Sequence, residues 1–194
     1  MSYRRYRPTT VSPIVILIAI NALVFLATSA DDNLIYTLGL RPETLSERPW
    51  TIVTNLFVHG GFGHILANML TLYFFGTYLS RLLGWRDCLF IYFLGGLLGN
   101  VFFILLAPPD YVGIGASGAV FALGGTLTVL RPNLRVIVFP IPAPIPLWVA
   151  VLGGFVIISF FPNVAWQAHL GGLVLGLAAG AFFRPRSRRT PYYW

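Results

Sequence analysis

The chain has 194 residues, of which 57% are hydrophobic and only 10% are charged, and its formal net charge is +7. Its mean hydropathy is +0.77. A chain this apolar is unsuited to a soluble domain of this length, so the composition predicts an integral membrane protein. The net charge does not indicate a nucleic-acid partner, because the arginines are scattered at the ends of apolar runs rather than gathered on a soluble module. We expect them to contact the lipid bilayer instead.

Six apolar runs approach the length that an α-helix needs to cross a bilayer, although helices inside a packed bundle can be shorter. The predicted fold class is therefore an all-α membrane protein, a bundle of six transmembrane helices. The predicted spans lie at about 13 to 30, 62 to 80, 88 to 106, 117 to 130, 146 to 161 and 167 to 183.

The basic residues fix the predicted orientation. All 13 are arginines, and only Arg41 and Arg48 fall in a loop on the outer side. The positive-inside rule assigns the arginine-rich side to the cytoplasm, so both chain termini are expected there. The other arginines are Arg4, Arg5, Arg7, Arg81, Arg86, Arg131, Arg135, Arg184, Arg186, Arg188 and Arg189.

The predicted organisation is one domain with two tails. Residues 1–12 and 185–194 are expected to be cytoplasmic tails around a six-span domain at 13–184, with a long outer loop at about 31–61. A retained first span keeps this topology consistent, although basic residues before it also resemble the start of a signal peptide. The lone Cys88 excludes an intrachain disulfide. We expect a prokaryotic plasma membrane.

Small residues recur along the last span. Gly172, Gly176 and Gly180 are spaced by four, which places them on one helix face. Such a face lets two helix backbones approach closely. We therefore expect these glycines to bring the fourth and sixth spans together rather than to take part in chemistry.

Polar side chains within the spans are costly and therefore informative. Ser117, His169, Asn68 and His64 each lie on the order of 20 to 25 Å above the arginine that ends their span, at 1.5 Å per residue. Three spans thus place a hydroxyl, two imidazoles and an amide in one layer, about 5 to 10 Å below the outer surface. His59 lies higher by the same count, and we expect it to support the site at its outer mouth.

This constellation has the chemistry of acyl transfer. A serine hydroxyl becomes a nucleophile when a neutral imidazole takes its proton, which predicts Ser117 as nucleophile and His169 as general base. The amide of Ser117, at a helix start, and the side chains of His64 and Asn68 can donate to an oxyanion. All six acidic residues fall in loops or at span edges, so only a dyad is available.

Two further residues are expected to support this pair. Gly115 lets the backbone approach a substrate closely. Phe121, one turn below Ser117, can pack against the imidazole or simply fill the core.

Other chemistries fit less well. The chain has no His-Glu-x-x-His sequence for zinc, no pair of aspartates within the spans, and no Gly-x-Ser-x-Gly elbow. A small transporter, or a haem protein ligated by His64 and His169, remains an alternative hypothesis.

Three blocks of sequence together resemble the rhomboid family of intramembrane serine proteases, in the right order on the second, fourth and sixth spans. The blocks are His59-Gly60-Gly61-Phe62-Gly63-His64-Ile65-Leu66-Ala67-Asn68, Gly115-Ala116-Ser117-Gly118 and Ala168-His169-Leu170-Gly171-Gly172 with Gly176. The resemblance implies Ser117 as nucleophile, His169 as base, and His64, Asn68 and the Ser117 amide as the oxyanion site.

The resemblance also implies single-span membrane proteins as substrates and requires no metal or organic cofactor. In many relatives an arginine directly follows the tryptophan of the first loop. Here Thr51 follows Trp50, and Arg48 lies two residues earlier. A non-catalytic rhomboid-like protein that binds client transmembrane helices is the main alternative.

Overall fold

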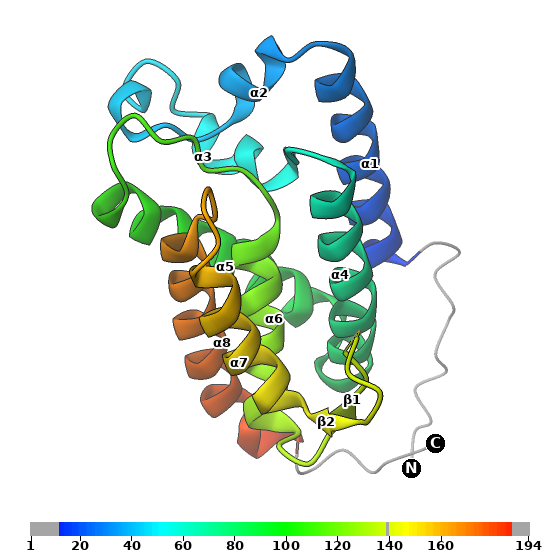
Figure 1. Ribbon diagram of the computed structural model, residues 1–194. Coiled ribbons are helices and arrows are strands. Elements are labelled where there is room, and N and C mark those ends of the chain that lie inside the picture. The colour runs from blue at the N-terminus through cyan, green and yellow to red at the C-terminus, as the bar shows by residue number, and fades with distance from the viewer. Residues whose placement is uncertain (1–11, 139, 188–194) are drawn as a thin grey trace.

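A computed structural model describes residues 12–138 and 140–187. The chain is mostly helical, and each of the six predicted runs coincides with a long helix (Figure 1). The helices are α1 (Pro13–Ala30), α4 (Phe62–Leu83), α5 (Trp85–Leu106), α6 (Ser117–Leu130), α7 (Leu147–Ser159) and α8 (Trp166–Ser187).

Among the described residues, three segments are long and apolar enough to cross a membrane by themselves, namely Pro13–Ala30, Trp85–Leu106 and Trp166–Arg184. The helices α6 and α7 are apolar but shorter, with 14 and 13 residues. A short helix can still lie across the bilayer core when its neighbours surround it, because its backbone groups bond within the helix and its ends are covered by protein.

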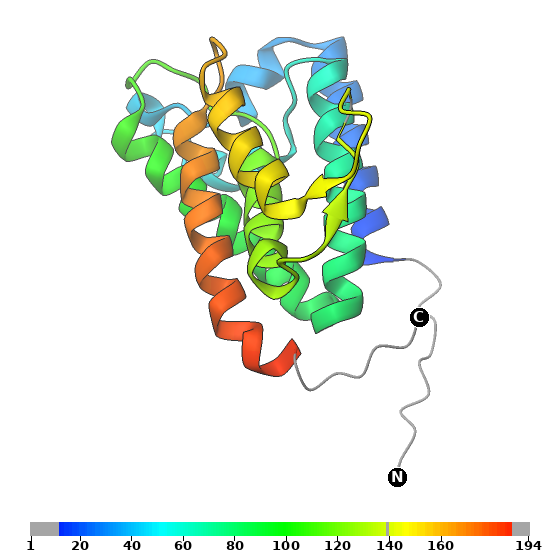
Figure 2. The same ribbon diagram turned by 60° about the horizontal axis from the view of Figure 1, so that its bottom comes forward.

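The loop between α1 and α4 is folded rather than irregular. It contains two short α-helices, α2 (Asn33–Leu38) and α3 (Thr51–Thr54), and two 3₁₀ turns, η1 (Pro42–Thr44) and η2 (Asn55–Phe57). Between α6 and α7 a small antiparallel hairpin pairs β1 (Arg135–Val136) with β2 (Ile145–Pro146), as Figure 2 shows.

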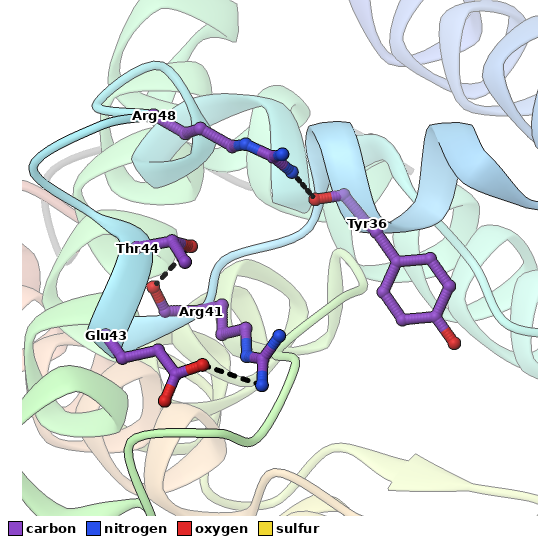
Figure 3. Close-up of polar contacts among 5 residues, drawn as sticks. All are labelled: Tyr36, Arg41, Glu43, Thr44 and Arg48. Carbon is purple, nitrogen blue, oxygen red and sulfur yellow. Dashed lines mark hydrogen bonds and ion pairs between the residues drawn. The ribbon is translucent and has the colours of Figure 1, made fainter.

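Two side chains fasten the outer loop to itself. The guanidinium of Arg48 donates a hydrogen bond of 2.8 Å to the carbonyl of Tyr36 (Figure 3), and the indole of Trp50 donates one of 3.0 Å to the carbonyl of Thr37. Both acceptors belong to α2, whose last carbonyls lack intrahelical partners. Arg48 therefore anchors this loop although it precedes Trp50 by two residues.

A second contact in the same loop joins its charged side chains. Arg41 and Glu43 form an ion pair of 2.7 Å on the loop surface (Figure 3). Because both side chains are more than a third exposed, this pair adds little to stability.

The helix α6 is the centre of the bundle, and ten of its 14 residues are buried. Its neighbour α8 approaches closely because the contact is made by glycines. A Cβ atom on Gly172 would fall on the carbonyl oxygen of Gly118, and one on Gly176 would fall on that of Ala122. The predicted packing of the fourth and sixth spans through glycine is thus seen directly in the structure.

The ends of the long helices separate the described arginines by side. Arg81 lies in the last turn of α4, Arg86 in the first turn of α5 and Arg131 directly after α6. These helix ends lie at the lower end of the bundle in Figure 1. Arg41 and Arg48 lie in the loop at the opposite end. The tails predicted at 1–12 and 185–194 fall almost wholly outside the described residues.

Candidate active site

Ser117 and His169 meet where α6 and α8 begin. The Oγ atom of Ser117 lies 2.7 Å from the Nε2 atom of His169. Ser117 is the first residue of α6 and His169 is in the first turn of α8, so both side chains project from the same end of two contacting helices. His169 is buried, with 6% of its surface exposed, and Ser117 is half-buried.

The hydrogen bond defines where the proton of His169 lies. If Nε2 accepts from the serine hydroxyl, the neutral imidazole carries its proton on Nδ1. That Nδ1 atom is buried, and the described residues offer it no hydrogen-bond partner. The two residues therefore form a pair without a third orienting group, as the placement of the acidic residues predicts.

An aromatic ring holds the imidazole instead. The centroid of the Phe121 ring lies 4.9 Å from that of His169, with the planes inclined by 33°. On its other side Phe121 meets Phe155 of α7 edge to face, at 6.0 Å. The predicted contact of Phe121 with His169 is present. Phe155 of α7 packs in turn against the ring of Phe121.

His64 approaches the same point from α4. A Cβ atom on Gly115 would lie 2.8 Å from the Nε2 atom of His64 and 3.7 Å from the Oγ atom of Ser117. Gly115 also has a φ of +117°, a conformation that side chains disfavour. Glycine is therefore required here for two reasons, and its lack of a side chain leaves room for the imidazole of His64.

The backbone sets the tautomer of His64. The amide of Gly60 donates to the Nδ1 atom of His64 at 3.4 Å. An imidazole nitrogen that accepts a hydrogen bond carries no proton, so a neutral His64 has its proton on Nε2. The Nε2 atom, which lies beside Gly115, is thus a donor, and stabilisation of an oxyanion requires a donor.

The remaining predicted donors are arranged differently. The side-chain amide of Asn68 donates 2.9 Å back to the carbonyl of His64, one turn earlier in α4, so at least one of its two N–H groups serves the helix rather than the serine. The amide of Ser117 is in the first turn of α6, where no intrahelical acceptor exists. The second N–H of Asn68 is not used by this bond, so the oxyanion role of Asn68, like those of His64 and this amide, stays a prediction.

His59 is buried beside His64. It precedes α4, so the helical rise used to place it does not apply, and the chain folds back until its ring lies 4.9 Å from that of His64. Only 1% of its surface is exposed. Burial and the nearby His64 lower the pKa of His59 to about 4, against the opposing effect of its contact with the Phe57 carbonyl. His59 is therefore neutral at physiological pH and supports the ring of His64.

Sequence reasoning missed one asparagine near the site, Asn55, which is the partner of Asn100. Asn55 and Asn100 are both buried and exchange hydrogen bonds through their side-chain amides, at 2.9 and 2.8 Å. Together with Ser117 they line a cavity of about 10 Å³. The sequence predicts an interhelical hydrogen bond for Asn100, and its side-chain amide donates 2.7 Å to the carbonyl of Ile52 in the helix α3. The signal that could have found Asn55 is an amide in an otherwise apolar stretch directly before a span.

The fold and the site together define a membrane-protein class: apolar helices packed through glycine, with a serine hydroxyl bonded to an imidazole between two of them. Residues 46–186 match the rhomboid domain. Because this match covers more than half of the chain, the protein belongs to the rhomboid family, whose members are multi-pass membrane proteins.

Three relatives show the breadth of this family. Rhomboid protein 1, mitochondrial, of Saccharomyces cerevisiae is 33% identical over 67% of this chain and 40% of its own length. Rhomboid protease GluP of Bacillus subtilis is 32% identical over 68% of this chain and 25% of its own length. Inactive RHOMBOID-like protein 8 of Arabidopsis thaliana is 30% identical over 79% of this chain and 44% of its own length. The chain thus spans less than half the length of these relatives.

Proposed function

We propose that this protein is an intramembrane serine endopeptidase that hydrolyses peptide bonds in or near the transmembrane segments of membrane proteins. The observation that carries the proposal is the 2.7 Å contact between Oγ of Ser117 and Nε2 of His169. Membership of a family that includes a named rhomboid protease supports it.

In the proposed reaction His169 removes the proton of Ser117 as the hydroxyl oxygen attacks the scissile carbonyl carbon. The carbonyl oxygen becomes an oxyanion, which the amide of Ser117 and the Nε2–H group of His64 stabilise. Protonated His169 then gives its proton to the leaving amine. Water hydrolyses the acyl-enzyme with His169 again acting as base, which regenerates the serine. Asn68 contributes by holding the turn of α4 that carries His64.

We propose further that the chain crosses the bilayer six times. The start of the first span and the end of the sixth then both lie on the cytoplasmic side. The alternating directions of the six long helices in Figure 1 support this. The arginines at one end support the orientation. The proposed substrates are single-span membrane proteins, whose helix must unwind to reach Ser117. The relatives come from a bacterium, a yeast and a plant, so the expected prokaryotic plasma membrane stays a prediction.

A non-catalytic role in binding client helices is the alternative, because one relative that covers most of this chain is named as inactive. The bonded Ser117 and His169 favour catalysis over this role. They also disfavour haem ligation by His64 and His169, since Nε2 of His169 is engaged with the serine.

The test is cleavage of a tagged single-span reporter by the purified protein in lipid. We expect Ser117→Ala to abolish cleavage without unfolding the protein. Ser80→Ala, a serine in α4 near the arginine-bearing end, is the matched control and should cleave like the parent. Cleavage by Ser117→Ala at the parent's rate would contradict the assignment, and absence of cleavage by the parent on a panel of reporters would favour the client-binding role.

A further inference from the structure

We infer that the buried amide pair of Asn55 and Asn100 is a positioning device for the nucleophile: it fixes the backbone that holds Gly115, and through Gly115 the side chain of Ser117. The inference rests on the proposed function, since it assigns these two residues a role in the same reaction. Neither side chain touches the reacting groups, so both are positioning residues rather than catalytic ones.

The side-chain amides of the pair are fully bonded. Nδ2 of Asn55 donates to Oδ1 of Asn100 at 2.9 Å, and Nδ2 of Asn100 donates to Oδ1 of Asn55 at 2.8 Å. Only 3% of Asn55 and 2% of Asn100 is exposed. A buried amide that loses its partner keeps its full desolvation cost, so each side chain holds the other in one orientation.

The pair joins two separate parts of the chain, the continuous segment of α3 and η2 and the helix α5. Asn100 belongs to the long helix α5, while Asn55 opens the turn η2. The second N–H of Asn100 donates 2.7 Å to the carbonyl of Ile52 in α3. The short elements α3 and η2 have too few internal bonds to be stable alone. Asn100 therefore ties them to a helix that is rigid.

Hydrogen bonds of Asn55 connect the amide pair to the segment before Ser117. The backbone carbonyl of Asn55 accepts a hydrogen bond of 2.9 Å from the amide of Gly115. The side-chain amide of Asn55 also reaches the carbonyl of Gly113, at 3.5 Å. On its other side Gly113 exchanges two backbone bonds with Leu40, of 2.7 and 3.0 Å. The segment before Ser117 is thus held from the outer loop, and in Figure 1 this segment descends beside α3 into α6.

The segment that holds Gly115 tolerates little movement. A Cβ atom on Gly115 would lie 2.8 Å from Nε2 of His64 and 3.7 Å from Oγ of Ser117, so a shift of Gly115 changes the distances among all three groups. A displacement of about 1 Å in an active site can cost up to about a hundredfold in rate. Holding Gly115 is therefore a requirement of the proposed chemistry and not only of the fold.

The experiment compares three variants: Asn55→Leu, Asn100→Leu and the double variant. Each single variant leaves one buried amide without its partner, so it should lower both the thermal midpoint and kcat. Replacing both amides by apolar groups of similar size is far less costly to stability. The double variant should therefore regain much of the thermal midpoint. Its kcat should nevertheless stay at least about tenfold below that of the parent, with KM changed by less than about threefold. Asn21→Leu, a buried asparagine of α1 bonded within its own helix, is the matched control.

Hydrogen exchange in the segment 113–118 gives a second readout that does not need activity. We expect the Gly115 amide to exchange faster in all three variants of the amide pair than in the parent and in Asn21→Leu. A double variant that regains both stability and full kcat would show that the pair is only structural and would overturn the inference. Unchanged exchange at Gly115 would overturn it as well. If the parent itself cleaves no reporter, the proposed function fails. The exchange measurement alone then decides whether the amide pair holds the backbone of Gly115.

Discussion

The α-carbon of Gly172 lies against the carbonyl oxygen of Gly118, so that these two residues set how closely α8 can approach α6. Ser117 directly precedes Gly118 and His169 is three residues before Gly172. The distance between the hydroxyl and the imidazole is therefore governed by a backbone contact one turn away. We therefore expect the hydrogen bond of 2.7 Å between these side chains to depend on that contact.

Gly172→Ala should separate the two helices. Because the added methyl group would overlap the Gly118 carbonyl, we expect a loss of about 1 to 3 kcal/mol in the free energy of unfolding, together with a severe loss of reporter cleavage. Gly153→Ala in α7 is the control, since nothing lies within 4 Å of a Cβ at that position. It should leave cleavage unchanged and raise stability slightly, as alanine favours the helix. Equal behaviour of the two variants would refute the role of the glycine contact.

Phe121→Leu should lower kcat by about threefold to tenfold, because the ring that lies against His169 restricts the orientations of an imidazole with no other partner on Nδ1. Phe121→Tyr keeps the ring and should retain most of the activity. The measurement is kcat on the reporter, with Phe182→Leu as the control because that ring is 73% exposed on α8. If Phe121→Leu turned over as fast as Phe182→Leu, the imidazole would not depend on this ring.

The outer loop offers a prediction for stability. Trp50→Phe removes the indole hydrogen bond to the Thr37 carbonyl and should lower the free energy of unfolding by about 0.5 to 1.5 kcal/mol. Arg48→Met removes the bond to Tyr36 and should have an effect of similar size. Trp148→Phe on the exposed side of α7 is the control. Thermal unfolding in the same detergent measures all three, and a change at Trp50 no larger than that at Trp148 would rule out the anchoring role.

His59 predicts how stability depends on pH. Its pKa in the folded protein is about 4, below the ordinary value of 6.5, so between these values the unfolded chain binds more protons than the folded one. Stability should therefore fall as the pH is lowered from about 6.5 towards 4. His59→Gln removes this contribution, and its thermal midpoint should vary less with pH over that window. Parallel profiles for the parent and the variant would show that His59 does not contribute.

The positions of the long helices could be predicted because each depends on a local property, the length of an apolar run. The contact of Ser117 with His169 could be predicted as well, since depth in each span can be counted from the arginine at its end. The hydrogen bond of Asn55 with Asn100 could not be predicted, because the two residues are 45 positions apart and no spacing links them. The folding of the loop between α1 and α4 could not be predicted for the same reason. The hydroxyl of Thr54 donates to the carbonyl of Leu38 at 2.7 Å, a tertiary contact that local sequence does not encode.

Covalent labelling tests the central claim most directly. A fluorophosphonate probe reacts with a serine only if a base activates it, and mass spectrometry identifies the residue that carries the adduct. We predict an adduct on Ser117 in the parent protein, its loss in His169→Ala, and its retention in Gln167→Ala, a buried neighbour on the same helix. An adduct on another serine, or undiminished labelling of Ser117 in His169→Ala, would contradict the account.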